Sequence, residues 1–425
     1  MIKASLIGHT IEVFAKFTER PTLPSDIIIR DFFRDRKYLG STDRRFIGEV
    51  YFGTIKHYLR LEAVAQDALK TKFNHPQLVV SAYLLAFKNE RPPELQKIIE
   101  TLGNSFARTY PLDVFEKMAD RKREERRLKQ LKPAERLALY YSFPIWFAEV
   151  LEKDYGPDQV EPILRSLNEE APTVLRANRI FVGRDELKKE LDDLGIQTTT
   201  SAIAEDALIL SKRLNVWDLK PFKQGHLEVQ DEGSQLVAPF AKITSNRIRV
   251  LDACAGAGGK SLHFASLLKS HGEIFSTDVD SRKLDEMRKR VVRSNAQNIR
   301  IVKPDKQDAM LGPKVFGTFD VVLLDVPCSG TGTIRRNPSI KWRLSDEMHD
   351  ELIAKQRSIL ERNAPYVKSR GVLLYSTCSL LRSESEDQVR WFTELHPEFT
   401  LEEERRVRPD IEGADGFFVA RLRRA

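Results

Sequence analysis

The sequence predicts a multidomain protein with a helical N-terminal part, a small α+β module and a C-terminal doubly wound α/β domain. Three observations lead to this prediction. Apolar residues recur at helical spacing near the N-terminus, short strand-like pieces surround a helical piece in the middle, and strands alternate with helices toward the C-terminus. We expect the parts to span residues 1–140, 141–240 and 241–425, with a linking helix at the start of the second.

The N-terminal part contains the segment STDRRFIGEVYFGTIKHYLRLEAVAQDALK, in which Thr42 is a candidate helix cap. Its apolar residues fall at helical spacing and predict the core of a helical bundle: Phe46, Ile47, Val50, Tyr51 and Ile55. The charge run ADRKREERRLKQLK at 119–132 is typical of a solvated helix face.

From Pro172 to about Gln230 the helical pattern gives way to short strand-like pieces. The pieces TVLRAN, ALIL and HLEVQD are strand-like, and they surround the helical piece RDELKKELDDLG. This arrangement predicts a small α+β module between two larger parts.

The C-terminal part alternates between buried strands and helices. The expected strands are RIRVLDA, EIFSTDVD, IRIVKPD, FDVVLLDVP and GVLLYSTC. Runs such as VVLL and GVLLY lack polar alternation, as expected for a parallel sheet that is covered on both faces. The segments EFTLEEE and GFFVARLRR predict a closing antiparallel hairpin, and the whole predicts a doubly wound α/β domain.

Composition narrows the class of protein. Of the 425 residues, 41% are hydrophobic and 31% charged, and we find no apolar run long enough for a membrane span. Three cysteines do not make a disulfide framework, so we expect a cytoplasmic protein, which we take to be a monomer. The net charge of +7 favours polyanionic partners, and the eight histidines lack the spacing of metal ligands, so no metal is expected.

The segment LDACAGAGGKSLHF places Gly256, Gly258 and Gly259 at a strand-to-helix turn. Glycines there let a cofactor approach the backbone, and the helix N-terminus supplies free N–H groups. Such turns serve NAD, FAD and S-adenosylmethionine alike.

Carboxylates follow the next two strands of the expected sheet. Asp278 ends the second strand, where it can hold a ribose diol or cap the following helix. Asp308 follows the third strand, where it can accept from the exocyclic amine of adenine, and Asp305 is an alternative for that role.

Two of the three cysteines, Cys328 and Cys378, follow central strands and are expected in one crevice. A structural role for buried thiols is the alternative. Methylation of a cytosine at carbon 5 needs a thiolate that adds to carbon 6, an acid near ring nitrogen 3 and a route for releasing the adduct. Asp325, three residues before Cys328, supplies the carboxyl group, and Lys260 and Arg335 are candidates for lowering the thiol pKa.

The motifs LDACAGAGGK, LLDVPCSGTGTIRRNPSIKW and YSTCSLLRSESEDQV together resemble the RsmB/Sun (NOL1/NOP2/Sun-type) family of RNA cytosine-5 methyltransferases. EVQDEGSQLVAP and DGFFVARL extend the likeness, which runs from about Tyr141 to the C-terminus. It implies a Rossmann-like class I methyltransferase domain that uses S-adenosylmethionine. The segment DRRFIGEVYFGTIKHYLRLE resembles the family's NusB-like RNA-binding domain, whereas 71–135 matches poorly.

The resemblance also implies roles for single residues. Cys378 would be the nucleophile and Cys328 would help to release the product, with Asp278, Asp308 and Asp325 lining the cofactor pocket. The cofactor loop would consist of Cys254, Ala255, Gly256, Ala257, Gly258, Gly259 and Lys260. We expect the thiol of this loop to pack and to take no part in catalysis. The loop lacks the proline that the family usually has before its paired glycines.

The stretch GTIRRNPSIKW begins four residues after Cys328. Arg335, Arg336 and Lys341 are candidates for binding RNA phosphates, Trp342 can stack or pack, and a solvated loop is the alternative. We expect the substrate to be 16S ribosomal RNA, with transfer RNA as an alternative. A non-catalytic RNA-binding assembly factor and a nicotinamide-dependent oxidoreductase are the rival functions.

Overall fold

The computed structural model describes residues 3–21, 23–72, 75–106, 110–306 and 310–425. The chain divides into two compact units, which we describe separately. The first unit comprises Met1–Glu169 and Ile334–Leu344, and the second comprises Glu170–Thr333 and Ser345–Ala425. No helix within the described ranges is both long and apolar enough to cross a membrane.

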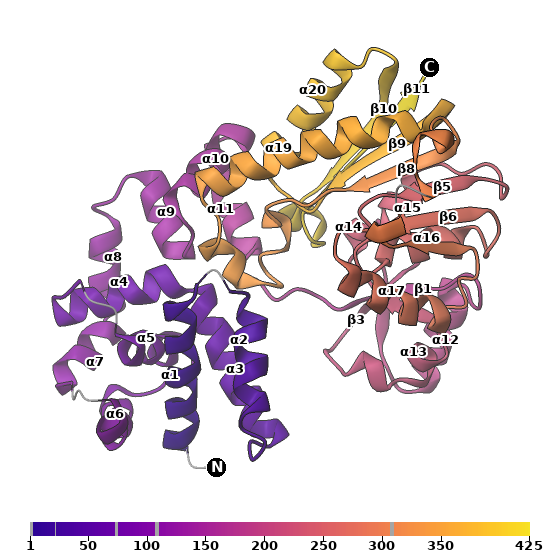
Figure 1. The fold of residues 1–425 in the computed structure, drawn as a ribbon. Coiled ribbons are helices and arrows are strands. Elements are labelled where there is room, and N and C mark those ends of the chain that lie inside the picture. The colour runs from indigo at the N-terminus through magenta and orange to yellow at the C-terminus, as the bar shows by residue number, and fades with distance from the viewer. Residues whose placement is uncertain (1–2, 22, 73–74, 107–109, 307–309) are drawn as a thin grey trace. The chain divides into compact units, whose positions relative to one another are not determined.

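The first unit is helical, as the sequence predicts (Figure 1). Its helices are α1 (Lys3–Glu19), α2 (Ser25–Arg34), α3 (Ser41–Lys56), α4 (Tyr58–Leu69), α5 (Pro76–Phe87), α6 (Pro92–Phe106), α7 (Leu112–Ala119), α8 (Arg121–Leu128), α9 (Pro133–Tyr141), α10 (Ile145–Tyr155) and α11 (Pro157–Ser166). A short 3-10 helix, Pro338–Trp342, also belongs to this unit.

The predicted apolar stripe lies on α3 and packs in the core of this unit. Ile47, Val50, Tyr51 and Ile55 are 0% exposed, and Phe46 packs against them with partial burial. Thr42 is not the helix cap, because α3 already begins at the preceding serine and the backbone N–H of Gly40 donates to the Asp43 carboxylate. The helical stretch that follows is divided at His57 into α3 and α4.

The second unit begins with a four-stranded antiparallel sheet in the order β2-β3-β1-β4. Its elements are β1 (Val174–Ala177), α12 (Arg184–Asp193), β2 (Thr198–Thr200), β3 (Ala207–Leu210) and β4 (Leu227–Val229), with the short α13 (Lys220–Lys223) before β4. The leucines of α12 pack on this sheet and close a small core of their own. The predicted strands and helix of the α+β module are present, and β2 is the strand that the sequence did not reveal.

The remainder of the second unit is built on a seven-stranded sheet in the order β10-β11-β9-β8-β5-β6-β7 (Figure 1). The strands are β5 (Arg249–Asp252), β6 (Glu273–Thr277), β7 (Ile299–Val302), β8 (Phe319–Asp325), β9 (Val367–Thr377), β10 (Phe399–Val407) and β11 (Phe417–Arg424). The first five pair in parallel, and β10 and β11 form the predicted antiparallel hairpin, with β11 against β9.

Helices cover both faces of this sheet. One face packs against α14 (Glu232–Gln235), α15 (Val237–Phe240), α16 (Gly259–Leu267) and α17 (Ser281–Arg293), and the other against α19 (Asp346–Asn363) and α20 (Glu386–Leu395). Leu323 and Leu324 of β8 lie in the two different cores, since successive strand residues point to opposite faces. Burial on both sides explains the unbroken apolar runs.

Candidate active site

A cavity of about 640 Å³ opens at the carboxyl ends of the parallel strands. Strand β5 lies between β6 and β8. The chain adds β6 and β7 on one side of β5 and then β8 and β9 on the other, so the strand order reverses here. Ligands bind at such a reversal in open α/β sheets. The predicted site residues in the lining are Cys254, Ala255, Gly256, Ala257, Gly259, Lys260, Asp278 and Asp325. The structure therefore brings most of the predicted cofactor residues to one cavity.

Gly258 of the same loop is outside the lining, and close packing explains why a glycine stands there. Its φ is +85°, and a Cβ atom there would come within 2.5 Å of the Met287 side chain of α17. Glycine is thus required at this position by close packing and by left-handed backbone, because any side chain would collide with α17. At Gly256, by contrast, no atom lies within 4 Å of the place that a Cβ would take.

Asp278 lies directly after β6 and is half-buried in the cavity wall. Its Oδ2 atom accepts from the backbone N–H of Gly256 at 2.8 Å, and its Oδ1 atom accepts from that of Asp280 at 2.8 Å. The cap of α17 is Asp280, which accepts from the N–H of Arg282, so the alternative reading of Asp278 as the helix cap is wrong. Asp278 instead ties the cofactor loop to the end of β6.

The structure does not place the residue expected at adenine, because Asp308 lies outside the described residues. Its alternative, Asp305, is exposed in the 3-10 turn Pro304–Lys306 and is not part of the cavity lining.

Asp325 ends β8 and is held from two sides. Its Oδ2 atom lies 2.5 Å from the Nζ atom of Lys260, and its Oδ1 atom accepts from the hydroxyl of Ser376 at 3.0 Å. Lys260 was expected to lower the pKa of a thiol, but the contacts that the structure gives its ammonium are with this carboxylate and, at 5.0 Å from the centroid, with the ring of Phe417.

The two strand-end thiols lie in direct contact. The Sγ atoms of Cys328 and Cys378 are 3.4 Å apart, and both thiols are free. Strands β8 and β9 pair in parallel, with Asp325 opposite Ser376. Cys328 comes three residues after Asp325 and Cys378 two residues after Ser376, so both thiols lie at the same end of the sheet. The hydrogen bond with Cys378, and then burial, raise the pKa of the Cys328 thiol well above its ordinary value.

Cys254 differs from this pair in place, because it lines the cavity whereas Cys328 and Cys378 are not part of the lining. Burial, followed by the charge of Asp252, raises the pKa of its thiol far above the ordinary value. A thiol that stays protonated is a poor nucleophile.

Asp252 is a site residue that the sequence reasoning missed. It ends β5, is 1% exposed, and lines the cavity, where its Oδ2 atom accepts from the Ser261 hydroxyl at 2.6 Å. Burial raises its pKa to about 7. The signal was available, because this is the first carboxylate at the end of the first strand of the predicted sheet.

The small antiparallel sheet braces the cofactor loop, which the sequence also did not reveal. The guanidinium of Arg176 on β1 donates to the Gly259 carbonyl at 2.8 Å, and that of Arg290 on α17 donates to the Ala257 carbonyl at 2.8 Å. Glu228 of β4 accepts from Arg290 at 2.9 Å and is itself 2% exposed. The sequence did contain a signal for this contact, because Arg176 is a charged residue inside the otherwise strand-like TVLRAN.

The structure corrects one of the predicted RNA contacts. Lys341 is 1% exposed and lies in the first unit, where its ammonium donates to the Lys56 carbonyl at 2.8 Å and to the Asn168 amide oxygen at 2.7 Å. It also lies 3.7 Å from the ring centroid of Phe143, and burial lowers its pKa well below the ordinary value. A cation enclosed in this way is a structural element of the helical unit and does not reach a phosphate.

The neighbouring candidates differ in exposure. Arg336 is exposed, whereas Arg335 is 6% exposed. Trp342 packs against the core of the helical unit, with its ring 5.5 Å from that of Tyr58, so the packing alternative holds. Within the described ranges, no three histidine, cysteine, aspartate or glutamate side chains gather as a metal site would require.

Comparison with known proteins agrees with this architecture. The family model described as 16S rRNA methyltransferase RsmB/F matches residues 242–423, and the ferredoxin-like domain of RsmF/B-like methyltransferases matches residues 143–217. The ribosomal RNA small subunit methyltransferase B of Serratia proteamaculans is 31% identical over 409 residues, which cover 91% of this chain and 92% of that protein. A probable methyltransferase of the same name from Bacillus subtilis is 29% identical, with all of both chains covered.

Solved structures show the same fold. The crystal structure of PH0851 has a TM-score of 0.78 and 26% identity, and 99% of each chain is covered. The structure of NSun6 from Pyrococcus horikoshii with SFG has a TM-score of 0.58 at 20% identity and covers 65% of this chain and 97% of that chain, so it shows the fold alone. The chain belongs to the RsmB/F family of 16S rRNA methyltransferases.

Proposed function

We propose that the protein methylates carbon 5 of a cytosine in 16S ribosomal RNA, with S-adenosylmethionine as the methyl donor and a covalent cysteine–carbon 6 adduct as the intermediate. The observation that carries this proposal is the contact of 3.4 Å between the Cys328 and Cys378 sulfurs at the carboxyl ends of two neighbouring strands. Two thiols in contact at strand ends suit a covalent step, in which one sulfur attacks the base and the other assists release.

The cavity fits S-adenosylmethionine in size and in its polar groups. Its volume of about 640 Å³ is within the range of small-molecule sites. Asp278 would accept from the ribose hydroxyls, and the loop that begins at Cys254 would present its backbone to the amino-acid end. When bound, the cofactor supplies a methyl group activated by a sulfonium charge.

The protein's own groups account for the attack. We assign the nucleophile to Cys378, whose thiolate would form a bond to carbon 6 while the electron pair of the ring double bond moves to carbon 5. The two sulfurs are hydrogen-bond partners at 3.4 Å and either can donate, so the S–H group of Cys328 would stabilise the Cys378 thiolate by donating to it. Asp325, fixed by Lys260 and Ser376, would carry the proton that ring nitrogen 3 needs as the adduct forms.

Release reverses the attack. The proton on the methylated carbon 5 leaves to a base, and the electron pair restores the ring double bond and expels the Cys378 thiolate. We assign the base to the sulfur of Cys328, because it lies beside the bond that must break. Its own thiol proton would first pass to solvent, the resulting thiolate would take the proton from carbon 5, and ring nitrogen 3 would return its proton to Asp325. Both sulfurs must be reduced for this cycle, so we propose that the protein works in a reducing compartment such as the cytoplasm.

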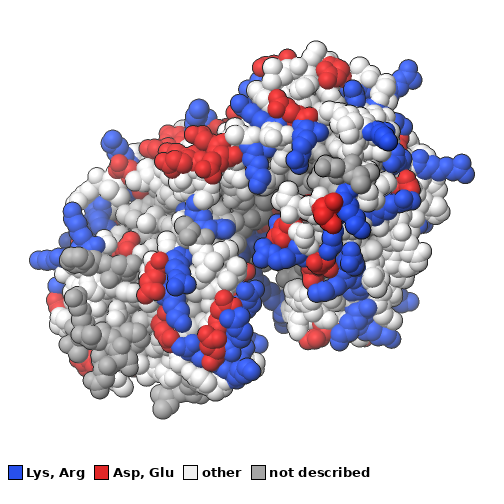
Figure 2. All heavy atoms as spheres, viewed as in Figure 1, with Lys and Arg blue, Asp and Glu red and all other residues white. Residues whose placement is uncertain are grey.

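RNA binding would draw on charge outside the cavity. Lysine and arginine side chains are spread over the visible face of the molecule with acidic side chains among them (Figure 2). We propose that Arg336, exposed in the first unit, contacts phosphates, and that the helical part resembles a NusB-like domain in function as well as in sequence. The target base would have to be flipped out of any helix to reach a sulfur.

Methylation of isolated small-subunit RNA tests the function directly. Purified protein, S-adenosylmethionine and 16S ribosomal RNA should yield a new 5-methylcytosine at one position, detected by bisulfite sequencing and by mass spectrometry of the nucleosides. A parallel reaction with transfer RNA distinguishes the alternative substrate. RNA binding without any methyl transfer would favour an assembly factor, and a methyl group on another base or atom would contradict the proposed chemistry.

The affinity for S-adenosylmethionine should rise between about pH 6 and pH 8. Asp252 lines the cavity with a pKa of about 7, so it gains a negative charge in this interval and attracts a cofactor with a net positive charge. Calorimetry should show a smaller rise for S-adenosylhomocysteine, which lacks the sulfonium, and a flat profile for Asp252→Asn.

The same raised pKa of Asp252 means that the folded state binds more protons than the unfolded state, so this residue's contribution to stability falls as pH rises from about 4 to about 7. If the free energy of unfolding changes equally with pH in wild type and in Asp252→Asn, the assignment is contradicted.

A further inference from the structure

We infer that Glu384 is a positioning residue for both thiols: its buried carboxylate fixes the loops after Cys328 and Cys378 and thereby sets the distance between the two sulfurs. The inference rests on the proposed function, in which one thiol attacks and the other assists release.

The carboxylate of Glu384 bonds to the residue that follows each thiol. It is 0% exposed, and its Oε1 atom accepts from the backbone N–H of Ser329 at 2.8 Å. Its Oε2 atom accepts from the hydroxyls of Ser329 and Ser379, each at 2.5 Å. Since Ser329 follows Cys328 and Ser379 follows Cys378, a single side chain holds both thiol-bearing loops.

Hydroxyl groups complete the link between the loops. The Ser379 hydroxyl lies 3.1 Å from those of Ser329 and Thr331, and the Thr331 hydroxyl oxygen accepts from the Leu380 backbone N–H at 2.9 Å. The backbone N–H of Gly332 donates to the carbonyl of Cys378 itself at 2.9 Å. A buried network whose members are all paired permits few other arrangements, so it holds the loops rigidly.

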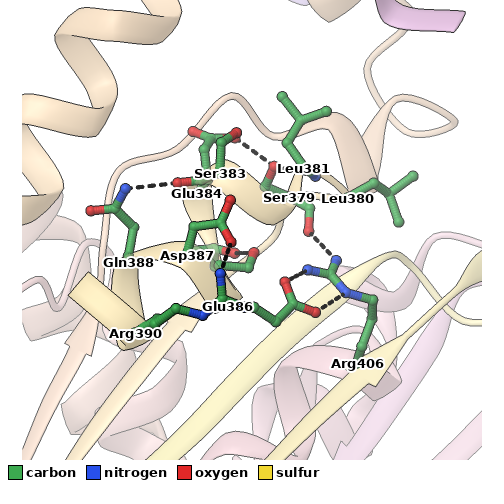
Figure 3. Close-up of polar contacts among 12 residues, drawn as sticks. Ser379, Leu380, Leu381, Ser383, Glu384, Glu386, Asp387, Gln388, Arg390 and Arg406 are labelled. Atoms are coloured by element: carbon green, nitrogen blue, oxygen red, sulfur yellow. Dashed lines mark hydrogen bonds and ion pairs between the residues drawn. The ribbon is translucent and has the colours of Figure 1, made fainter. Parts of the chain in front are cut away.

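The glutamate and the second loop are themselves braced. The Gln356 amide of α19 donates to Glu384 Oε1 at 3.0 Å, and the Tyr375 hydroxyl donates to the Glu384 carbonyl at 2.8 Å. On the side of β10, Arg406 donates to the Ser379 carbonyl at 3.1 Å and pairs with Glu386 (Figure 3). Several elements of the sheet therefore converge on this network.

This geometry predicts which step depends on Glu384. Attack needs the RNA and one sulfur, whereas release as proposed needs both sulfurs at the same base. Displacements of about 1 Å can lower rates about a hundredfold when reacting groups must meet. Loosening the network should therefore lower kcat and leave adduct behind, while KM for RNA changes little.

Phenylarsine oxide tests the spacing without RNA. It joins two thiols: two arsenic–sulfur bonds form, the arsenic–oxygen bond breaks, and the two thiol protons leave with that oxygen as water. Wild type should bind the arsenical tightly, and Cys328→Ala should not. Glu384→Ala should bind at least about tenfold more weakly. Glu384→Gln should lie between, because its amide oxygen can still accept from Ser329 but its NH₂ group cannot accept hydroxyl protons.

Asn178→Ala is the matched control. Asn178 is 2% exposed just after β1, and its amide donates to the carbonyls of Gly225 and Ser294 at 2.9 and 3.0 Å, so its loss removes buried hydrogen bonds that no residue of the Glu384 network shares. It should bind the arsenical like wild type, and melting curves of the variants show whether Glu384→Gln is folded at the temperature used.

RNA turnover completes the test. Glu384→Gln and Glu384→Ala should show a lower kcat, a KM within about threefold of wild type and a fraction of RNA bonded to protein. Arsenical binding equal to wild type, or an unchanged kcat in both variants, overturns the positioning role. Weakened arsenical binding in the variants together with no RNA methylation by wild type would leave the positioning role standing and refute the proposed function.

Discussion

Cys328→Ala should leave methylated RNA covalently bonded to the protein. The Cys378 thiolate of this variant can still attack carbon 6, and the methyl group can still move to carbon 5. Elimination then lacks its base, so the carbon 5 proton stays and the carbon 6–sulfur bond does not break. With labelled RNA, a denaturing gel should show a band in which RNA migrates with the protein, and turnover should stop at about one methyl group per protein molecule.

Three further variants give this result its meaning. Cys378→Ala should show neither methylation nor the band, and the double variant should also show no band. Cys254→Ala is the control for loss of a thiol, and it should form no trapped band because its sulfur lies in the cofactor loop. A trapped band in Cys378→Ala would exchange the roles of the two sulfurs. Methylation by both single variants without trapping would mean that the thiols are structural.

Asp278→Ala should weaken binding of S-adenosylmethionine about 10- to 100-fold. The ribose hydroxyls lose a charged acceptor, and such hydrogen bonds contribute about 1.5–3 kcal/mol. The variant also frees the N–H of Gly256, which donates to this carboxylate at 2.8 Å, so the loop becomes less ordered before the cofactor arrives. Calorimetry of the variant and wild type measures the change.

Asp285→Ala provides the comparison for this experiment. Asp285 is an exposed carboxylate on α17 that pairs with Lys303 and is not part of the cavity lining. Its replacement removes the same charge from the same region and should leave the affinity within about twofold of wild type. If Asp278→Ala binds like Asp285→Ala, Asp278 does not hold the ribose.

The sequence predicted the parts of the fold in which local pattern and burial agree. Apolar runs without alternation marked the parallel strands, because both sheet faces are covered. It missed β2, whose residues are Thr198–Thr200, because three threonines carry no apolar pattern. It did not reveal the break at His57, since apolar spacing continues across this residue although α3 ends at Lys56 and α4 begins at Tyr58.

Within the site, the sequence predicted which residues lie at strand ends. It did not predict which side chains from distant parts of the chain would contact them. Strand ends placed Asp278, Asp325 and the thiols on one edge of the sheet. Lys341 was assigned to RNA from its charge and its place after a motif, and the structure shows it enclosed by helices that come much earlier in the chain. Glu384 was part of a quoted motif, but its partners at positions 329 and 379 emerge only when β8 and β9 lie side by side.

The helical unit is discontinuous in the chain, since Ile334–Leu344 leaves the second unit just after the Cys328 loop and returns to it at Ser345. The ammonium of Lys341 meets the carbonyl of Lys56, the last residue of α3, where it complements the negative end of that helix. No single cut in the polypeptide can therefore separate the two units intact. A catalytic fragment that began at Glu170 would carry Ile340 and Lys341 as surface residues, stripped of the core that encloses them. A fragment of the helical unit is complete only if it includes residues 334–344.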